Sequence, residues 1–413
     1  MMQEIANQKQ NNGWLKALLL LFLSLWCISP PLFINGAARI AALMCAIVFL
    51  FLALLSSRSK DRWKIILCVL IYSLYKIVAN LNADFNDFIL ANIQIFIIIL
   101  FSLIGVCFLW AGNGRRIYEK IFWAVLLIYP VWMLLTLREY MVTPNISRML
   151  SGNGMADAYA YSNMGIGGYG MIYSVIFLIP LIVYALKNGR IFTCPQKVLL
   201  LLNLLLSILL VLRSGYALAL IAATIGILSI LIIRKRSIAT VAMLVFGFLI
   251  VILAYMTFQD RINAFLIKIS QSTLYEGKVN DIIYLLVTGD SVGTVQSRVL
   301  RYSWSMQIFL QSPFFGCANE AVIGGHSTIL DTFAAYGLAG GLPLLFIIIH
   351  LPVQYMRDEP RFFGISITML MLLILVGVTD NYAAAMAPVV YLMYPILIEM
   401  IRRKKPTEKN VTL

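Results

Sequence analysis

The chain has 413 residues, of which 61% are hydrophobic and only 12% are charged, and its mean hydropathy is +0.90. A soluble domain is about 45–50% apolar and about 25% charged, so this composition excludes a cytosolic enzyme, a secreted disulfide-bonded domain and a disordered chain. The net charge of +14 would suit a nucleic-acid-binding protein, but the positions of the charges argue against that partner.

Apolar segments long enough to cross a bilayer recur along the whole chain. A membrane-spanning helix needs about 20 mainly apolar residues. We therefore predict an all-α polytopic membrane protein with about 12 transmembrane helices. The candidate spans are 15–34, 36–55, 63–79, 88–110, 119–137, 165–186, 198–212, 215–233, 238–256, 328–350, 361–379 and 384–401.

The basic residues cluster on one side of these spans. If the amino terminus lies in the cytoplasm, the inner segments contain the basic groups Arg58–Lys64, Arg115–Arg116, Arg234–Arg236 and Arg402–Lys405. Lys and Arg are enriched in cytoplasmic loops of membrane proteins. The positive charge therefore indicates topology, with both termini cytoplasmic, and no nucleic-acid partner is expected.

The only long hydrophilic stretches then lie on the outer side, at 138–164 and 259–327. Long loops in compact proteins are often functional. We divide the chain into a transmembrane bundle of about nine spans at 1–258, an outer loop domain with amphipathic helices at 259–327, and the last three spans with a basic cytoplasmic tail at 328–413. Any chemistry is expected at the outer face.

Arg213 lies alone between two predicted spans on that face. An arginine close to the apolar core of a bilayer is costly. It either extends toward the interface from a helix end or supplies a fixed cation for an anionic ligand.

The pattern predicts an outer helix over 296–311, ended by Ser312-Pro313. Arg298 and Arg301 share one face of it with Ser305. Two guanidinium groups on one face could bind a diphosphate through paired hydrogen bonds, or they could contact lipid headgroups. An apolar face of the same helix could rest on the membrane bundle; it comprises Val299, Tyr302, Met306 and Phe309.

His326 is the only histidine on the outer side, in Gly324-Gly325-His326-Ser327, directly before the tenth span. Thr328 and Asp331 have the spacing of a capping box, which places His326 beside a helix amino terminus. That position disfavours a protonated imidazole, so His326 could accept a proton from a sugar hydroxyl. A structural histidine is the alternative.

Asp380 lies in a short outer turn and could approach the same ligand-binding cavity as His326 and the arginines. A turn residue without a role in binding is the alternative. With only two histidines in the chain, a His-rich metal site is excluded, whereas carboxylates could still hold Mg²⁺. We predict no metal and no cofactor.

The chain resembles the O-antigen polymerase and O-antigen ligase superfamily of bacterial envelope proteins. The motifs that support the resemblance are Ser297-Arg298, Trp304, Ser312-Pro313-Phe314-Phe315-Gly316, Gly325-His326-Ser327-Thr328-Ile329-Leu330-Asp331 and Tyr336-Gly337-Leu338-Ala339-Gly340. The number of spans and the large outer loop before the last three spans also match.

The resemblance implies a GT-C-like, metal-independent, inverting glycosyltransferase of the bacterial inner membrane, with a periplasmic active site. It implies an undecaprenyl-diphosphate-linked oligosaccharide as substrate, and a chain-length regulator is a candidate partner beside the lipid bilayer. The residues it implies are His326, Arg298 and Arg213 as catalytic, and Arg301, Asp380 and Ser327 as substrate-binding. The sequence departs from the family order at Arg213, which precedes Ser214 instead of following a serine.

Within this superfamily the sequence favours a polymerase of lipopolysaccharide O-antigen. His326 is followed by Ser327 rather than by the asparagine common in ligases, a Leu-Asp pair follows, and the interval from Pro313 to His326 is short. A ligase that transfers glycan to the lipid A-core is the alternative. A transporter or flippase with 12 spans is a third possibility, although no internal repeat is evident.

Overall fold

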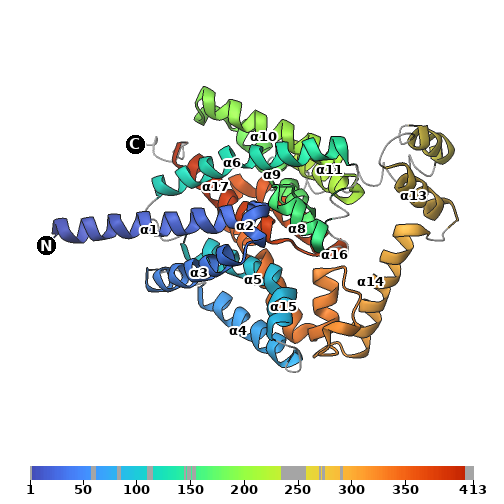
Figure 1. Ribbon diagram of the computed structural model, residues 1–413, viewed down its shortest axis with the longest axis horizontal. Helices are drawn as coiled ribbons and strands as arrows, with labels where there is room; N and C mark the ends of the chain where they lie inside the picture. The colour runs from blue at the N-terminus through green and yellow to red at the C-terminus, as the bar shows by residue number, and fades with distance from the viewer. Residues whose placement is uncertain are drawn as a thin grey trace. The chain divides into compact units, whose positions relative to one another are not determined.

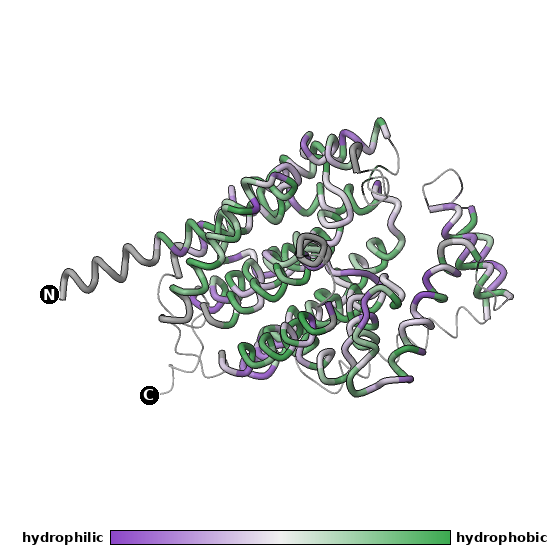
Figure 2. Tube along the Cα trace, turned by 60° about the horizontal axis from the view of Figure 1, so that its bottom comes forward, coloured by the Kyte–Doolittle hydropathy of each residue, from purple (hydrophilic) through white to green (hydrophobic). Residues whose placement is uncertain are grey.

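A computed structural model of the chain describes residues 2–56, 62–80, 85–108, 115–143, 146, 150, 155–233, 257–268, 271, 275–288 and 292–404. Over these residues the protein is all-α and has no strand (Figure 1). Hydrophobic residues run along most of the helices (Figure 2). The predicted span 238–256 lies outside the described residues.

Six helices among the described residues are long and apolar enough to cross a membrane, so the chain is a multi-pass membrane protein. They are Tyr118–Val142, Tyr169–Lys187, Cys194–Arg213, Thr328–Asp358, Pro360–Thr379 and Ala384–Arg403. Four shorter apolar helices coincide with further predicted spans: Trp14–Ile28, Gly36–Leu52, Asn92–Val106 and Ala217–Ile232.

The chain forms two compact units. The first comprises Met1–Leu67, Ile89–Val211 and Tyr382–Leu413, and the second comprises Cys68–Phe88 and Leu212–Asn381. The second unit thus contains the whole predicted outer loop 259–327 together with spans on both sides of it. The division at 258 and 327 stays a prediction.

In the first unit, α1 packs against α3 and α6, and α9 packs against the carboxy-terminal segment. The bounds are α1 Met2–Ile28, α2 Pro30–Ile34, α3 Gly36–Ser56, α5 Phe85–Phe108, α6 Arg115–Val142, α8 Met155–Asn163, α9 Tyr169–Lys187, α10 Cys194–Arg213 and α17 Tyr394–Lys404. The predicted span 15–34 is interrupted at Ser29, because Pro30 cannot continue the hydrogen bonds of α1. The predicted span 384–401 begins with a 3₁₀ turn at Ala384–Met386 and a π-helical turn at Val389–Met393.

The second unit is built around a hairpin of α15 (Thr328–Asp358) and α16 (Phe363–Thr379), joined by the 3₁₀ turn η4 (Pro360–Phe362). Helix α14 packs on α15, and α11 packs on α16. The remaining helices are α4 Arg62–Ala79, α11 Ala217–Ile232, α13 Glu276–Thr288, α14 Gly293–Gln311 and the 3₁₀ turn η3 Glu320–Val322. The start of α15 and the end of α16 therefore lie at the same end of the hairpin.

Helix α15 is broken at Gly337, whose backbone angles are φ 59° and ψ −159°. Two hydrogen bonds run from the loop to the kink, Cys317 N to Ala334 O at 3.0 Å and Ala318 N to Ala335 O at 2.8 Å. Two more run from the kink to the loop and complete what we call the backbone clasp: Leu338 N to Pro313 O at 2.8 Å and Ala339 N to Phe314 O at 3.0 Å. The clasp satisfies the peptide groups that the kink frees, and it fixes the loop that precedes His326 against α15.

Candidate functional site

Helix α14 contacts the rest of the second unit through residues of both of its predicted faces. Ser305 is fully buried, whereas Val299 and Met306 are 45% and 43% exposed. The sequence had suggested that Val299, Tyr302, Met306 and Phe309 rest on the bundle. Tyr302 and Phe309 do contact the hairpin of α15 and α16, Phe309 with its ring 5.8 Å from that of Phe333, whereas Val299 and Met306 do not face it. Arg298, Arg301 and Ser305 bind the loop before α15 and the turn after α16.

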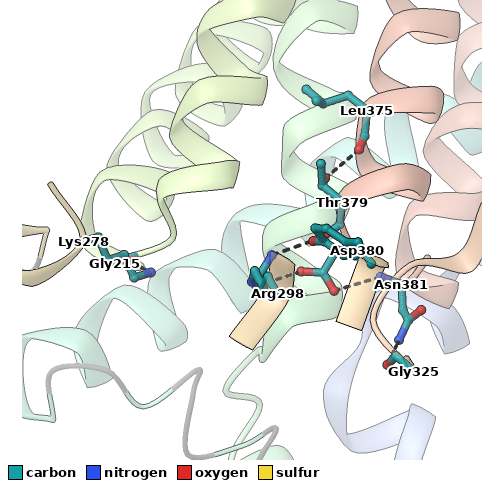
Figure 3. A network of polar contacts seen from close by, with 9 residues as sticks. Gly215, Lys278, Arg298, Gly325, Leu375, Thr379, Asp380 and Asn381 are labelled. Atoms are coloured by element: carbon teal, nitrogen blue, oxygen red, sulfur yellow. Dashed lines mark hydrogen bonds and ion pairs between the residues drawn. The ribbon is translucent and has the colours of Figure 1, made fainter. Parts of the chain in front are cut away.

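Arg298 binds the turn that follows α16 (Figure 3). Its Nη1 donates to the backbone carbonyl of Thr379 at 3.1 Å, and its Nη2 pairs with Asp380 Oδ2 at 3.3 Å. Tyr302, one turn further along α14, donates its hydroxyl to the same carbonyl. The Arg298 side chain is 37% exposed and that of Asp380 is 17% exposed, so the ion pair is accessible from solvent on the arginine side.

Arg301 binds the loop on the other side of the site. Its Nη1 donates to the carbonyl of Gly324 at 3.3 Å, and the Gly324 amide donates to Ser305 Oγ at 2.9 Å. A Cβ at Gly324 would collide with the backbone carbonyl of Arg301. Glycine is therefore required where the loop approaches α14 so closely.

His326 is half-buried and lies two residues after Gly324, the residue that Arg301 binds. Burial lowers the pKa of its imidazole, and the positive charges of Arg301 and Arg298 lower it further, against a smaller raising effect of Asp380 and of the Gly325 carbonyl. The sequence argument for a neutral imidazole rested on a helix amino terminus, whereas in the structure desolvation and two guanidinium groups are the causes. A neutral ring is the form that can accept a proton.

Ser327 is fully buried and caps α15. Its hydroxyl accepts from Leu330 N at 3.0 Å and donates to Gly377 O at 2.9 Å, so its only proton is already engaged. The expected capping box began at Thr328, but the cap lies one residue earlier. Asp331 completes it from the helix side by accepting from Ser327 N at 2.8 Å. The role of Ser327 in substrate binding stays a prediction.

Asn381, which the sequence analysis did not select, links the two loops of the site. Its Nδ2 donates to the carbonyl of Gly325 at 3.1 Å, and its backbone amide donates to Asp380 Oδ1 at 2.8 Å (Figure 3). The turn after α16 is therefore tied both to Arg298 and to the residue before His326.

Arg213 ends α10, and its side chain is exposed. Within the described part of the chain it makes no hydrogen bond or ion pair. The turn after it is held by Lys278 of α13, whose Nζ donates to Gly215 O at 2.6 Å and lies 5.5 Å from the ring centre of Tyr216. The structure thus brings together His326, Arg298, Arg301 and Asp380. No contact among the described residues joins Arg213 to these four residues. Figure 3 shows Lys278 and Gly215 apart from Arg298 and Asp380.

Lys76 is a buried cation that the sequence analysis passed over. Its ammonium pairs with Glu320 at 2.5 Å and lies 5.8 Å and 5.5 Å from the ring centres of Tyr72 and Tyr336. A single lysine inside the apolar run 65–79 was the available signal, because a charge in such a run usually has a specific partner. The pair anchors η3 to α4.

Among the residues that the structure describes, no group of three or more His, Cys, Asp and Glu side chains could hold a metal ion. The second unit thus presents a half-buried imidazole flanked by two guanidinium groups and a carboxylate, at one end of an apolar helical hairpin in a multi-pass membrane protein. Comparisons of the chain with protein families, with curated proteins and with solved structures found no match.

Proposed function

We propose that this membrane protein is an O-antigen polymerase, which transfers a growing glycan from undecaprenyl diphosphate onto a new lipid-linked repeat unit at the periplasmic face of the inner membrane. The observation that supports it best is that the half-buried imidazole of His326 lies close enough to Arg301 and Arg298 for their charges to lower its pKa. A site for this reaction needs cations for a diphosphate and a neutral base for a hydroxyl.

The proposal includes a GT-C-like bundle of about 12 spans with both termini in the cytoplasm. The positions of basic residues on the hairpin of α15 and α16 support this topology, although Arg357 and Arg361 are paired with Asp358 and Glu359. His326 and Asp380 lie at one end of the hairpin, and Arg357 and Arg361 lie at the other. If the end with Arg357 and Arg361 faces the cytoplasm, the site faces the periplasm.

The reaction is a single displacement at the anomeric carbon of the donor glycan. The bond from that carbon to the diphosphate oxygen breaks, and the electron pair leaves with the diphosphate. The acceptor hydroxyl forms the new glycosidic bond and gives its proton to His326. Attack from the side opposite the leaving group inverts the anomeric centre.

The two arginines stabilise the charge that develops on the leaving diphosphate. Arg298 already holds a single carboxylate, that of Asp380, and a diphosphate offers more negative charge and more acceptor oxygens for the same guanidinium. Among the described residues, Arg301 makes one side-chain hydrogen bond, and its acceptor is a neutral carbonyl. The proposal gives Arg213 a catalytic role only because the sequence resembles the O-antigen polymerase and ligase superfamily.

The test is lengthening of lipid-linked repeat units by the purified protein in liposomes. We expect His326→Ala to lower the rate by about 100-fold or more, because general base catalysis contributes about 10²–10⁴-fold. Arg298→Lys should also lose activity, since an ammonium cannot reproduce the forked geometry. Arg357→Gln, at the opposite end of the hairpin, is the matched control and should retain wild-type activity.

Wild-type lengthening by His326→Ala would refute the role of the histidine. Attachment of glycan to lipid A-core without lengthening would identify a ligase instead. Accumulation of the lipid-linked substrate on the other side of the membrane, again without lengthening, would identify a transporter or flippase.

A further inference from the structure

We propose that Asp331 and Ser305, which bind the backbone of the Gly324–Ser327 segment, are positioning residues that hold His326 in its place beside the arginines of α14. Neither side chain needs to touch a substrate. The kinetic consequence of this inference rests on the proposed function, whereas the placement of the imidazole can be measured without it.

The carboxylate of Asp331 is buried and uses both of its oxygens. Asp331 is 8% exposed, and Ser305 is fully buried. Oδ1 accepts from the Ser305 hydroxyl at 2.5 Å, and Oδ2 accepts from the Ser327 amide at 2.8 Å. A buried carboxylate with two donors is well satisfied, and each donor is costly to lose.

Ser305 extends this contact to the other end of the segment. While it donates to Asp331, its oxygen accepts from the amide of Gly324 at 2.9 Å. One carboxylate therefore fixes the backbone immediately after His326 directly, and the backbone two residues before it through a serine. Since the segment between these two anchors is so short, His326 has little freedom to move along α14.

The arrangement goes beyond what a helix cap requires. The cap of α15 needs only the Ser327 hydroxyl, which accepts from Leu330 N, and one oxygen of Asp331, which accepts from Ser327 N. The second oxygen of Asp331 is bound instead by a residue of α14, the same helix that presents Arg298 and Arg301. The hydrogen bonds of Asp331 and Ser305 thus attach the segment that contains His326 to α14, the helix of the two guanidinium groups.

This tie predicts an effect on the titration of His326. The pKa of the imidazole is lowered by burial and by the charges of Arg301 and Arg298, while Asp380 opposes them. Each of these effects depends on where the ring lies. A segment released from Asp331 and Ser305 should let the ring move toward solvent and away from the arginines, and its pKa should rise toward the ordinary value of histidine.

The experiment uses the full chain in nanodiscs with isotope-labelled histidine. Because the chain has only two histidines, two imidazole signals are expected, and His326→Gln assigns them. Ser305→Ala removes one buried hydroxyl, and Asp331→Asn keeps the shape but turns one acceptor into a donor that faces another donor. Ser303→Ala is the matched control, because Ser303 is an exposed serine of the same helix.

We expect both network variants to raise the pKa of His326 and Ser303→Ala to leave it unchanged. With the proposed activity present, both variants should lower kcat by about 10- to 100-fold with little change in KM, the usual cost of a misplaced catalytic group. If the two variants only lower the melting temperature while His326 titrates as in the wild type, the residues are merely structural and the inference is wrong. If the titration changes as expected but the wild-type protein lengthens no glycan, the positioning role stands and the proposed function fails.

Discussion

Gly337→Ala should destabilise the second unit strongly, because two separate costs act at the kink of α15. The angles φ 59° and ψ −159° lie in a region that only glycine adopts readily, and another residue there costs about 1–3 kcal/mol. In addition, a Cβ would collide with the carbonyl of Phe314, which is one of the two acceptors for the kink amides in the backbone clasp.

Relief of that collision should break the clasp hydrogen bonds of Leu338 and Ala339, each of which contributes about 1 kcal/mol net. Together with the backbone strain, the free energy of unfolding should fall by about 4 kcal/mol. For a unit of roughly 150–250 residues this corresponds to a melting temperature about 8–16 °C lower. Gly277→Ala in α13 is the matched control, because no atom lies within 4 Å of the added Cβ, and it should melt like the wild type.

The assay is thermal unfolding in nanodiscs, followed by tryptophan fluorescence. A local measurement is available as well, because Cys317 is a free cysteine whose amide belongs to the clasp. In a chain that retains only this cysteine, Gly337→Ala should speed thiol labelling at low temperature. If the variant melts within about 1 °C of the wild type and Cys317 reacts no faster, the energetic account of the kink is wrong.

Two further predictions concern charges of the second unit. Arg301→Gln should raise the pKa of His326 and Asp380→Asn should lower it, and imidazole NMR can follow both shifts. Because the pKa of His326 in the folded chain is below the ordinary value, protonation favours the unfolded chain. The free energy of unfolding should therefore fall as the pH drops through the ordinary pKa of histidine. A shift in the opposite direction in either variant would contradict the assignment of causes. Lys76→Met should cost about 2 kcal/mol by leaving Glu320 unpaired, and adding Glu320→Gln should recover part of that loss in a double-mutant cycle; strictly additive losses would show that the pair is not coupled.

Local patterns in the sequence predict local structure in this chain. Apolar segments indicate the all-α fold, and the helix predicted over 296–311 is present and ends at Gln311, before Ser312-Pro313. The common face of Arg298, Arg301 and Ser305 follows from helical spacing alone. The partners of this face did not follow, because they lie in the loop before α15 and in the turn after α16.

Contacts between distant segments leave no such pattern. Arg298 and Asp380 are 82 positions apart, and Lys76 and Glu320 are 244 apart. No periodicity links their segments, so the ion pairs could be found only in the structure. The position of the cap at Ser327 instead of Thr328 also escaped prediction, since both residues have side chains that can cap a helix.

The clasp between the loop and α15 consists of peptide groups, so the side chains of the loop take no part in its hydrogen bonds. Phe314 and Phe315 are each 66% exposed although their backbones lie at this junction. These two aromatic positions can therefore be exchanged in evolution or engineering, to suit a different lipid or partner, while the path of the chain toward the histidine is retained.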